Sequence, residues 1–107
     1  MRKIVQVAFV CAVTVGLAAV TAFAQSGGEA VYKAKCASCH GANGTAPAAM
    51  AKSMGIKAAS DPTVKSKSEA QMVELTRKGI GIMPGYAGKL TDAQIKDSVE
   101  YFRSLGK

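Results

Sequence analysis

Three stretches of the chain repeat apolar residues at the spacing of an amphipathic helix, and each follows a capping signal. The signal is a serine or threonine with Glu or Gln three residues later, and it begins at Ser26, Ser68 and Thr91. The pattern predicts three main helices, which cover about residues 29–38, 68–78 and 92–105. No stretch alternates apolar and polar residues as a strand would, so the predicted fold class is all-α.

The segments between these helices are rich in residues that break regular structure. Residues 41–62 are predicted as loop, with a short helix at about 48–54 that ends at Gly55. The stretch KGIGIMPGYAGKL, residues 78–90, contains three glycines and a proline within eight positions. It is therefore predicted to form an irregular loop between the second and third main helices.

The first 24 residues have the pattern of a secretory signal peptide. Two basic residues precede an almost wholly apolar run at 4–20, and an Ala-x-Ala sequence ends at Ala24. A retained membrane anchor is the alternative, because about 20 apolar residues can span a bilayer. We predict a cleaved signal peptide at 1–24, one domain at 25–107 and a periplasmic location.

The predicted mature domain is small, basic and poor in large apolar side chains. Its 83 residues include twelve Lys and Arg against seven Asp and Glu, for a net charge of +5. This charge fits simple solubility as well as docking to an acidic partner. Basic residues are scattered and Trp is absent, so no nucleic-acid module is expected. A domain of this size usually needs a disulfide, a metal or a prosthetic group to complete its core.

The motif CASCH places Cys36, Cys39 and His40 within five residues, at the end of the first predicted helix. A disulfide between helical positions i and i+3 would be strained, and no strand precedes the motif as in redox C-x-x-C proteins. Structural zinc needs four ligands, and the chain has one histidine and no second cysteine pair. C-x-x-C-H is the attachment motif of c-type haem. The pattern favours one haem, bound covalently through both cysteines, with His40 on the iron.

A second axial ligand must come from a methionine or a lysine, because the chain has no other histidine. Met83 is the favoured candidate, since it lies in the glycine-flanked loop GIGIMPGYAG, which can reach the opposite face of the ring. Met72 has the helical spacing of a core residue. Met50 and Met54 fit core or haem-edge packing better than ligation, and Met54 is the alternative ligand.

Residues 25–107 resemble the class I c-type cytochromes over nearly their whole length. The resemblance is carried by the four-residue spacings of Gly28, Tyr32 and Cys36, by CASCHG, and by IMPGYAGKLTDAQIKDSVEYFRSL. It implies the cytochrome c fold, in which helices and loops wrap around one covalently attached haem. The resemblance also implies that Met83 is the distal ligand.

The resemblance assigns two further roles. The carbonyl of Pro47 is expected to accept a hydrogen bond from His40 and so orient its ring. The first and last helices of the family cross near a glycine with aromatic rings around it, which corresponds to Gly28, Tyr32 and Tyr101. The chain departs from some members in lacking Trp, so the partners of the haem propionates stay open, with Arg77, Lys78 and Lys52 as candidates.

The resemblance and the motif together predict a periplasmic carrier of single electrons that cycles iron between Fe(III) and Fe(II). No enzymatic activity is expected. Its expected partners are redox proteins that donate and accept electrons, membrane complexes among them, and it is expected to be a monomer. Two alternatives stay open: a haem subunit of a larger redox complex, and a gas-sensing or peroxidase-like protein with a labile sixth ligand.

Overall fold

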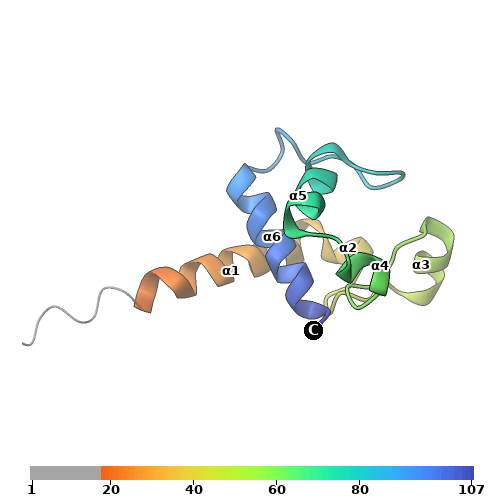
Figure 1. Ribbon diagram of the computed structural model, residues 1–107, viewed down its shortest axis with the longest axis horizontal. Coiled ribbons are helices and arrows are strands. Elements are labelled where there is room, and N and C mark those ends of the chain that lie inside the picture. Colours follow the sequence, from red (N-terminus) through yellow and green to blue (C-terminus); the bar gives the residue numbers. More distant parts are fainter. Residues whose placement is uncertain (1–17) are drawn as a thin grey trace, which may run out of the picture.

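A computed structural model describes residues 18–107 of the chain (Figure 1). Six helices follow one another along these residues: α1 (Ala18–Lys35), α2 (Ala37–His40), α3 (Ala48–Met54), α4 (Pro62–Lys65), α5 (Glu69–Lys78) and α6 (Asp92–Leu105). The described part contains no strand, only isolated bridges between single residues in the loop that joins α5 to α6. The all-α class is therefore confirmed, and α1, α5 and α6 are the three main helices.

The crossing of α1 and α6 is the main helix contact of the fold (Figure 1). Gly28 is buried there, and a Cβ atom at its position would lie 2.5 Å from the carbonyl oxygen of Asp97. Only glycine allows the two backbones to approach so closely. Next to this contact, the ring centroid of Tyr32 lies 5.2 Å from that of Tyr101 and 6.0 Å from that of Phe102. The crossing predicted from the resemblance is present.

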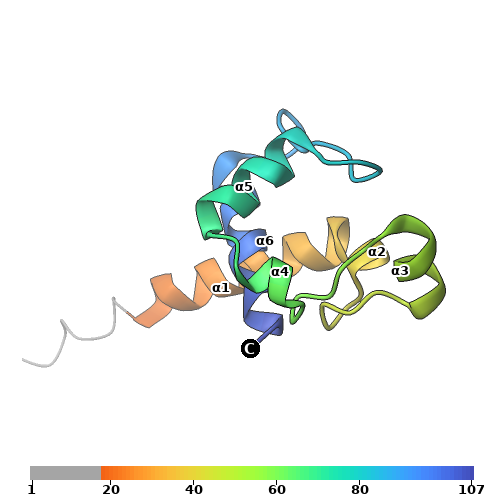
Figure 2. The ribbon, with the colours of Figure 1, turned by 45° about the vertical axis from the view of Figure 1, so that its right-hand side comes forward.

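Helix α5 packs along α6 on the side away from α1 (Figure 2). Met72 of α5 and Ile95 and Val99 of α6 form the buried cluster between them. The hydroxyls of Ser68 and Thr91 accept hydrogen bonds from the third residue of each helix, and the Gln there completes the capping box. Both predicted helix starts are thus confirmed, and they fix where α5 and α6 enter the core.

One local prediction is wrong, and one short helix was not predicted. Helix α1 begins at Ala18 and runs through Ser26, because the alanine-rich segment before Ser26 favours helix and leaves no end there to cap. Helix α4 begins at the last residue of the predicted loop and was not predicted; Asp61 caps it by accepting a hydrogen bond from the Thr63 backbone N–H at 2.8 Å. The signal peptide prediction falls mainly on residues 1–17, which lie outside the described part, and it stays a prediction.

The glycine pair at the crossing gives a direct test of this packing. Gly28→Ala forces a Cβ against the backbone of α6, and we expect it to lower the free energy of unfolding by about 2 kcal/mol or more. Gly27→Ala, one residue earlier in the same helix, has no atom within 4 Å of the new Cβ. It should instead stabilise the protein by about 0.5–1 kcal/mol. Denaturant unfolding of both variants, followed by circular dichroism, measures this; equal effects would contradict the close crossing.

Candidate functional site

One cavity of about 550 Å³ lies between the end of α1, helix α2, helices α5 and α6, and the loop that joins them. In both ribbon views the loop that joins α5 to α6 lies above α2 (Figure 1, Figure 2). Most of the wall is apolar, and the part formed by α4, α5 and α6 includes Val64, Met72, Leu75, Val99 and Phe102. An apolar space of this size suits a flat organic cofactor.

The CASCH motif forms the lower wall of this cavity. Cys36 interrupts the helix between α1 and α2, and its carbonyl accepts hydrogen bonds from the backbone N–H groups of Cys39 (3.2 Å) and His40 (2.9 Å). This short turn directs Cys36, Cys39 and His40 into the cavity wall together. Both thiols are free and half-buried, and burial raises the pKa of Cys36, with the nearby Cys39 as a smaller cause.

His40 has the surroundings of a metal ligand. Burial lowers the pKa of its imidazole, so the ring is neutral at physiological pH and a ring nitrogen can offer its lone pair. The ring lies edge-on to Phe102, with centroids 5.2 Å apart. Its Nδ1 atom is buried and has no hydrogen-bond partner among the described residues. A buried imidazole nitrogen normally has a hydrogen-bond partner, so Nδ1 still lacks an acceptor in this structure.

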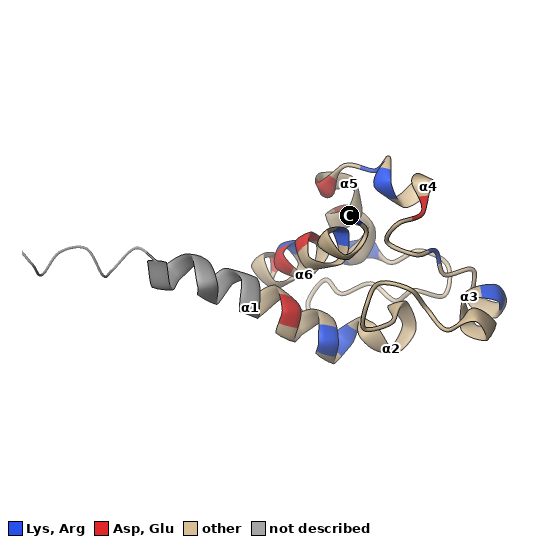
Figure 3. Cartoon of the chain, turned by 90° about the horizontal axis from the view of Figure 1, so that it is seen from below, with Lys and Arg blue, Asp and Glu red and all other residues tan. Residues whose placement is uncertain are grey.

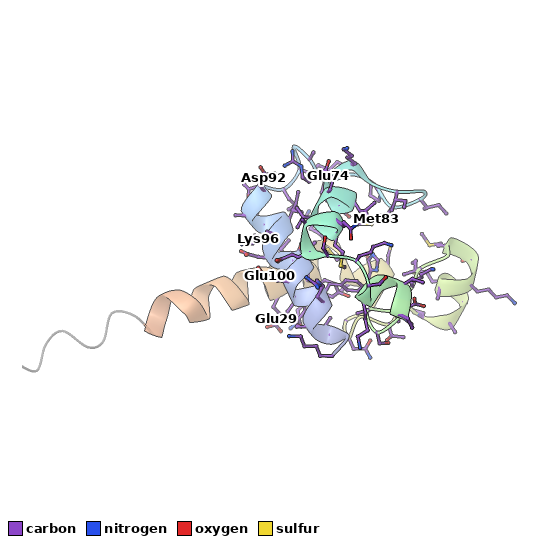
Figure 4. All side chains as sticks on the ribbon, in the orientation of Figure 1. Glu29, Glu74, Met83, Asp92, Lys96 and Glu100 are labelled. Atoms are coloured by element: carbon purple, nitrogen blue, oxygen red, sulfur yellow. The ribbon has the colours of Figure 1, made fainter. Side chains whose placement is uncertain are left out.

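The loop from Gly79 to Leu90 brings Met83 to the cavity from the other side (Figure 4). Ile80 and Met83 exchange two backbone hydrogen bonds, at 3.1 and 3.0 Å, which close a tight turn. The base of the loop is narrow, because a Cβ at Gly79 would lie 2.6 Å from the backbone nitrogen of Gly85. The two glycines let the loop fold back on the end of α5 and hold Met83 at the cavity edge.

The structure brings together four of the five predicted site residues. Cys36, Cys39, His40 and Met83 all line the cavity, and so does Met54. The fifth, Pro47, is exposed and begins α3, where its carbonyl accepts a hydrogen bond from Ala51 N at 2.8 Å. Its predicted bond to His40 is not formed in this structure.

Among the described residues, those that bring charge to the cavity wall are Lys35, Lys57 and Lys67, and no acidic residue lines it. None of the three propionate candidates chosen from the sequence lies there. Arg77 instead pairs with Asp92 at 2.9 Å, and Lys78 pairs with Glu74 at 3.0 Å. Figure 3 shows how the charges are distributed over the helices. All three candidates lie on helices, Lys52 on α3 and Arg77 and Lys78 on α5. Which side of a helix meets the cavity depends on tertiary packing, for which a single sequence gives little signal.

Sequence reasoning also missed the apolar rim of the cavity. Ile80 and Ile82 line it and are 59% and 66% exposed, the largest exposures among the described large apolar residues. Their alternation with glycine beside Met83 is a signal that could have marked them as surface residues. Thr76 and Tyr86 also line the cavity, from the end of α5 and from the loop.

The donor set fits a c-type haem. Two thiols stand three residues apart for thioether bonds, a neutral imidazole follows them, a thioether sulfur faces them across an apolar space, and only lysines bring charge. No helix in the described part has the length and apolar character needed to cross a bilayer. Fold and site together define a small class I c-type cytochrome, a class whose members carry covalently bound haem c.

Comparison with known proteins agrees with this class. Residues 23–102 match the family model described as cytochrome C oxidase, cbb3-type, subunit III. The chain is 33% identical to cytochrome c6 of Picosynechococcus sp., over 94% of this chain and 92% of that protein. It is 35% identical over 86 residues to the cbb3-type cytochrome c oxidase subunit CcoP of Azospirillum sp. strain B510. A solved structure, KustC0563 c-type cytochrome, superposes with a TM-score of 0.67 at 24% identity, over 75% of this chain and 98% of that one.

The chain thus belongs to the cytochrome family of the cbb3-type oxidase subunit III. It spans only 28% of the length of the CcoP relative, which is therefore a much longer protein. It spans nearly all of the cytochrome c6 relative. The chain therefore matches nearly the whole of one relative and about a quarter of the other.

The two cysteines allow a direct test of covalent haem attachment. Cys36→Ala and Cys39→Ala should each keep the haem attached through the remaining thioether, whereas the double variant should lose covalent attachment completely. Haem staining after denaturing electrophoresis measures this. Ser38→Ala, at the exposed position between the cysteines, is the control and should retain full attachment. Attached haem in the double variant would contradict the assignment.

Proposed function

We propose that this protein is a periplasmic carrier of single electrons with one haem c, held by Cys36 and Cys39 and ligated by His40 and Met83. The observation that carries the proposal is that all four side chains line one apolar cavity, although Met83 is 43 residues from His40 in sequence. Haem c supplies a one-electron couple at its iron, with two axial positions for protein ligands. No bond-making chemistry is assigned to the protein.

The residues around the cavity have distinct tasks. The neutral His40 ring gives a nitrogen lone pair from below, and the Met83 sulfur approaches from the loop above. A soft sulfur ligand favours the reduced metal and raises the potential relative to a second histidine. The apolar wall excludes water, and a filled sixth position denies oxygen an open site.

Pro47 is assigned as the acceptor for His40 Nδ1–H. A carbonyl oxygen has two lone pairs, and the bond from Ala51 N uses one of them. The other is available for the buried nitrogen, which has no acceptor among the described residues. Such a bond would fix the ring orientation and increase the donor strength of the ligating nitrogen.

Partners are expected at the rim formed by Ile80 and Ile82. Exposed apolar side chains beside a redox centre suit transient docking, since they bring the cofactor edge close to a partner with little desolvation of charge. Lys35, Lys57 and Lys67 surround the same cavity, so a partner with acidic residues near its own centre is favoured. Redox proteins of membrane complexes are the proposed partners, and we propose that the carrier itself is a monomer.

A second candidate is that the protein serves as a bound haem subunit of a cbb3-type oxidase. The matching family and the CcoP relatives favour it. The near-complete coverage of cytochrome c6 favours the diffusing carrier. Cell fractionation separates the two: a carrier is released with periplasmic contents and lacks residues 1–24, whereas a subunit copurifies with the oxidase in detergent.

Met83 gives the central test. In Met83→Ala, the long-wavelength sulfur-to-iron absorption of the ferric protein should disappear and carbon monoxide should bind the reduced protein readily, because the sixth position opens. Met54→Ala is the matched control, since Met54 lines the same cavity and was the alternative ligand. It should retain the absorption. If the absorption is lost in Met54→Ala but not in Met83→Ala, the axial ligand is Met54. If the unaltered protein binds carbon monoxide readily, a gas sensor or a peroxidase is favoured.

The rim can be tested with serine substitutions. Ile80→Ser together with Ile82→Ser should slow oxidation of the reduced protein by membranes that contain cbb3-type oxidase about tenfold, since apolar contacts at the centre of an interface dominate binding. Oxidation by hexacyanoferrate, a small ion that needs no interface, should change little. Ala93→Ser, an exposed apolar-to-serine change on α6, is the control. Equal rates in all three proteins with membranes would exclude this rim as the docking surface.

A further inference from the structure

One side-chain hydrogen bond joins the Met83 loop to the cysteine segment. The Tyr86 hydroxyl donates to the backbone carbonyl of Lys35 at 3.2 Å, between residues 51 positions apart in sequence. Among the hydrogen bonds of the described residues, it alone links the loop at 79–90 to the segment of α1 and α2. Since α1 and α5 each pack on α6 rather than on one another, few other contacts set the distance between the two cavity walls.

The helix interruption at Cys36 makes the Lys35 carbonyl available as an acceptor. In a continuous helix this oxygen would receive the N–H of Cys39, four residues later. Here Cys39 N donates to the carbonyl of Cys36 instead, at 3.2 Å. The last carbonyls of a helix need partners from elsewhere, and the Tyr86 hydroxyl meets that need directly before the first cysteine.

Tyr86 is itself firmly held. Its backbone N–H donates to Thr76 O at 3.0 Å, and its carbonyl accepts from Lys89 N and Leu90 N, each at 3.0 Å. Its ring lines the cavity and packs against the buried cluster of α5 and α6. Because Tyr86 is fixed in this way, its hydrogen bond holds the Lys35 carbonyl at a set distance from the end of α5 and from the loop.

We propose that Tyr86 is a positioning residue that ties the Met83 loop to the cysteine segment, so that the Met83 sulfur stays over the cavity. The proposal rests on the proposed function, in which Met83 is the axial ligand. Tyr86 touches neither the iron nor a reacting atom; it acts by restricting how far the loop can swing away. Opening of the loop is the motion that would free the sixth position.

The test removes only the hydroxyl. In haem-loaded Tyr86→Phe, the sulfur-to-iron absorption should persist but carbon monoxide should bind the reduced protein about fivefold faster, since one hydrogen bond opposes loop opening. The reduction potential should fall as the thioether contact weakens. Tyr101→Phe is the matched hydroxyl deletion, because Tyr101 lies outside the cavity wall. It should leave both readouts unchanged.

A loss of overall stability could also speed opening, and Ser68→Ala controls for it. This variant removes the cap at the far end of α5 and weakens the fold without touching the tie. If Ser68→Ala binds carbon monoxide as fast as Tyr86→Phe, or if Tyr86→Phe matches the unaltered protein, the proposed tie is overturned. If the unaltered protein already lacks the absorption and binds carbon monoxide, the ligand assignment of Met83 fails and the tie fails with it.

Discussion

The close crossing of α1 and α6 at Gly28 is the contact on which the geometry of the site depends. Helix α1 ends at Lys35, directly before the cysteines, and α6 supplies Val99 and Phe102 to the opposite part of the cavity wall. The distance between the two helices therefore sets how deep His40 lies against Phe102. A side chain at Gly28 would separate the helices, and the effect would reach the site through rigid helices rather than through a flexible loop.

The protein builds this site with a very small core. Among the described residues, the only large side chains that are fully buried are Tyr32 and Ile95. Several of the other large apolar side chains, Met72, Val99 and Phe102 among them, also line the cavity. A chain of this size gains little from its own apolar contacts, so a bound apolar ring would contribute as much to folding as to redox chemistry. Cofactor attachment and stability are thus coupled, as in metal-dependent small domains.

Local signals explain what the sequence could predict. Capping boxes at Ser68 and Thr91 involve residues within one helical turn, so their geometry follows from spacing alone. CASCH and the glycine-flanked Met83 are likewise short motifs whose chemistry is evident from residue type. Their convergence on one cavity was expected from the family resemblance, and the fold produces it.

Features that depend on tertiary packing were not predictable. The three propionate candidates lie outside the cavity wall, because the way a helix packs decides which of its side chains reach the cavity, and composition does not. The bond between Tyr86 and Lys35 connects segments 51 residues apart, and it exists because the helix breaks at Cys36. No local motif near Lys35 or Tyr86 predicts this contact. The helix break at Cys36 was not predicted either, since the first helix was expected to continue to about residue 38.

The Met83 loop shows how a glycine-rich segment can still be rigid. Its glycines permit close backbone approaches at its base, and those approaches in turn leave the loop few conformations. Backbone bonds from Tyr86 and Ala87 to Thr76 and Arg77, at 3.0 and 3.1 Å, fasten it to the end of α5. If Met83 binds the iron as proposed, a loop held in this way would let its sulfur stay in place when the iron changes its charge, and little structural rearrangement is what rapid exchange of single electrons requires. The same rigidity leaves the loop tip, Ile80 and Ile82, as a fixed apolar surface that a partner can meet without first ordering it.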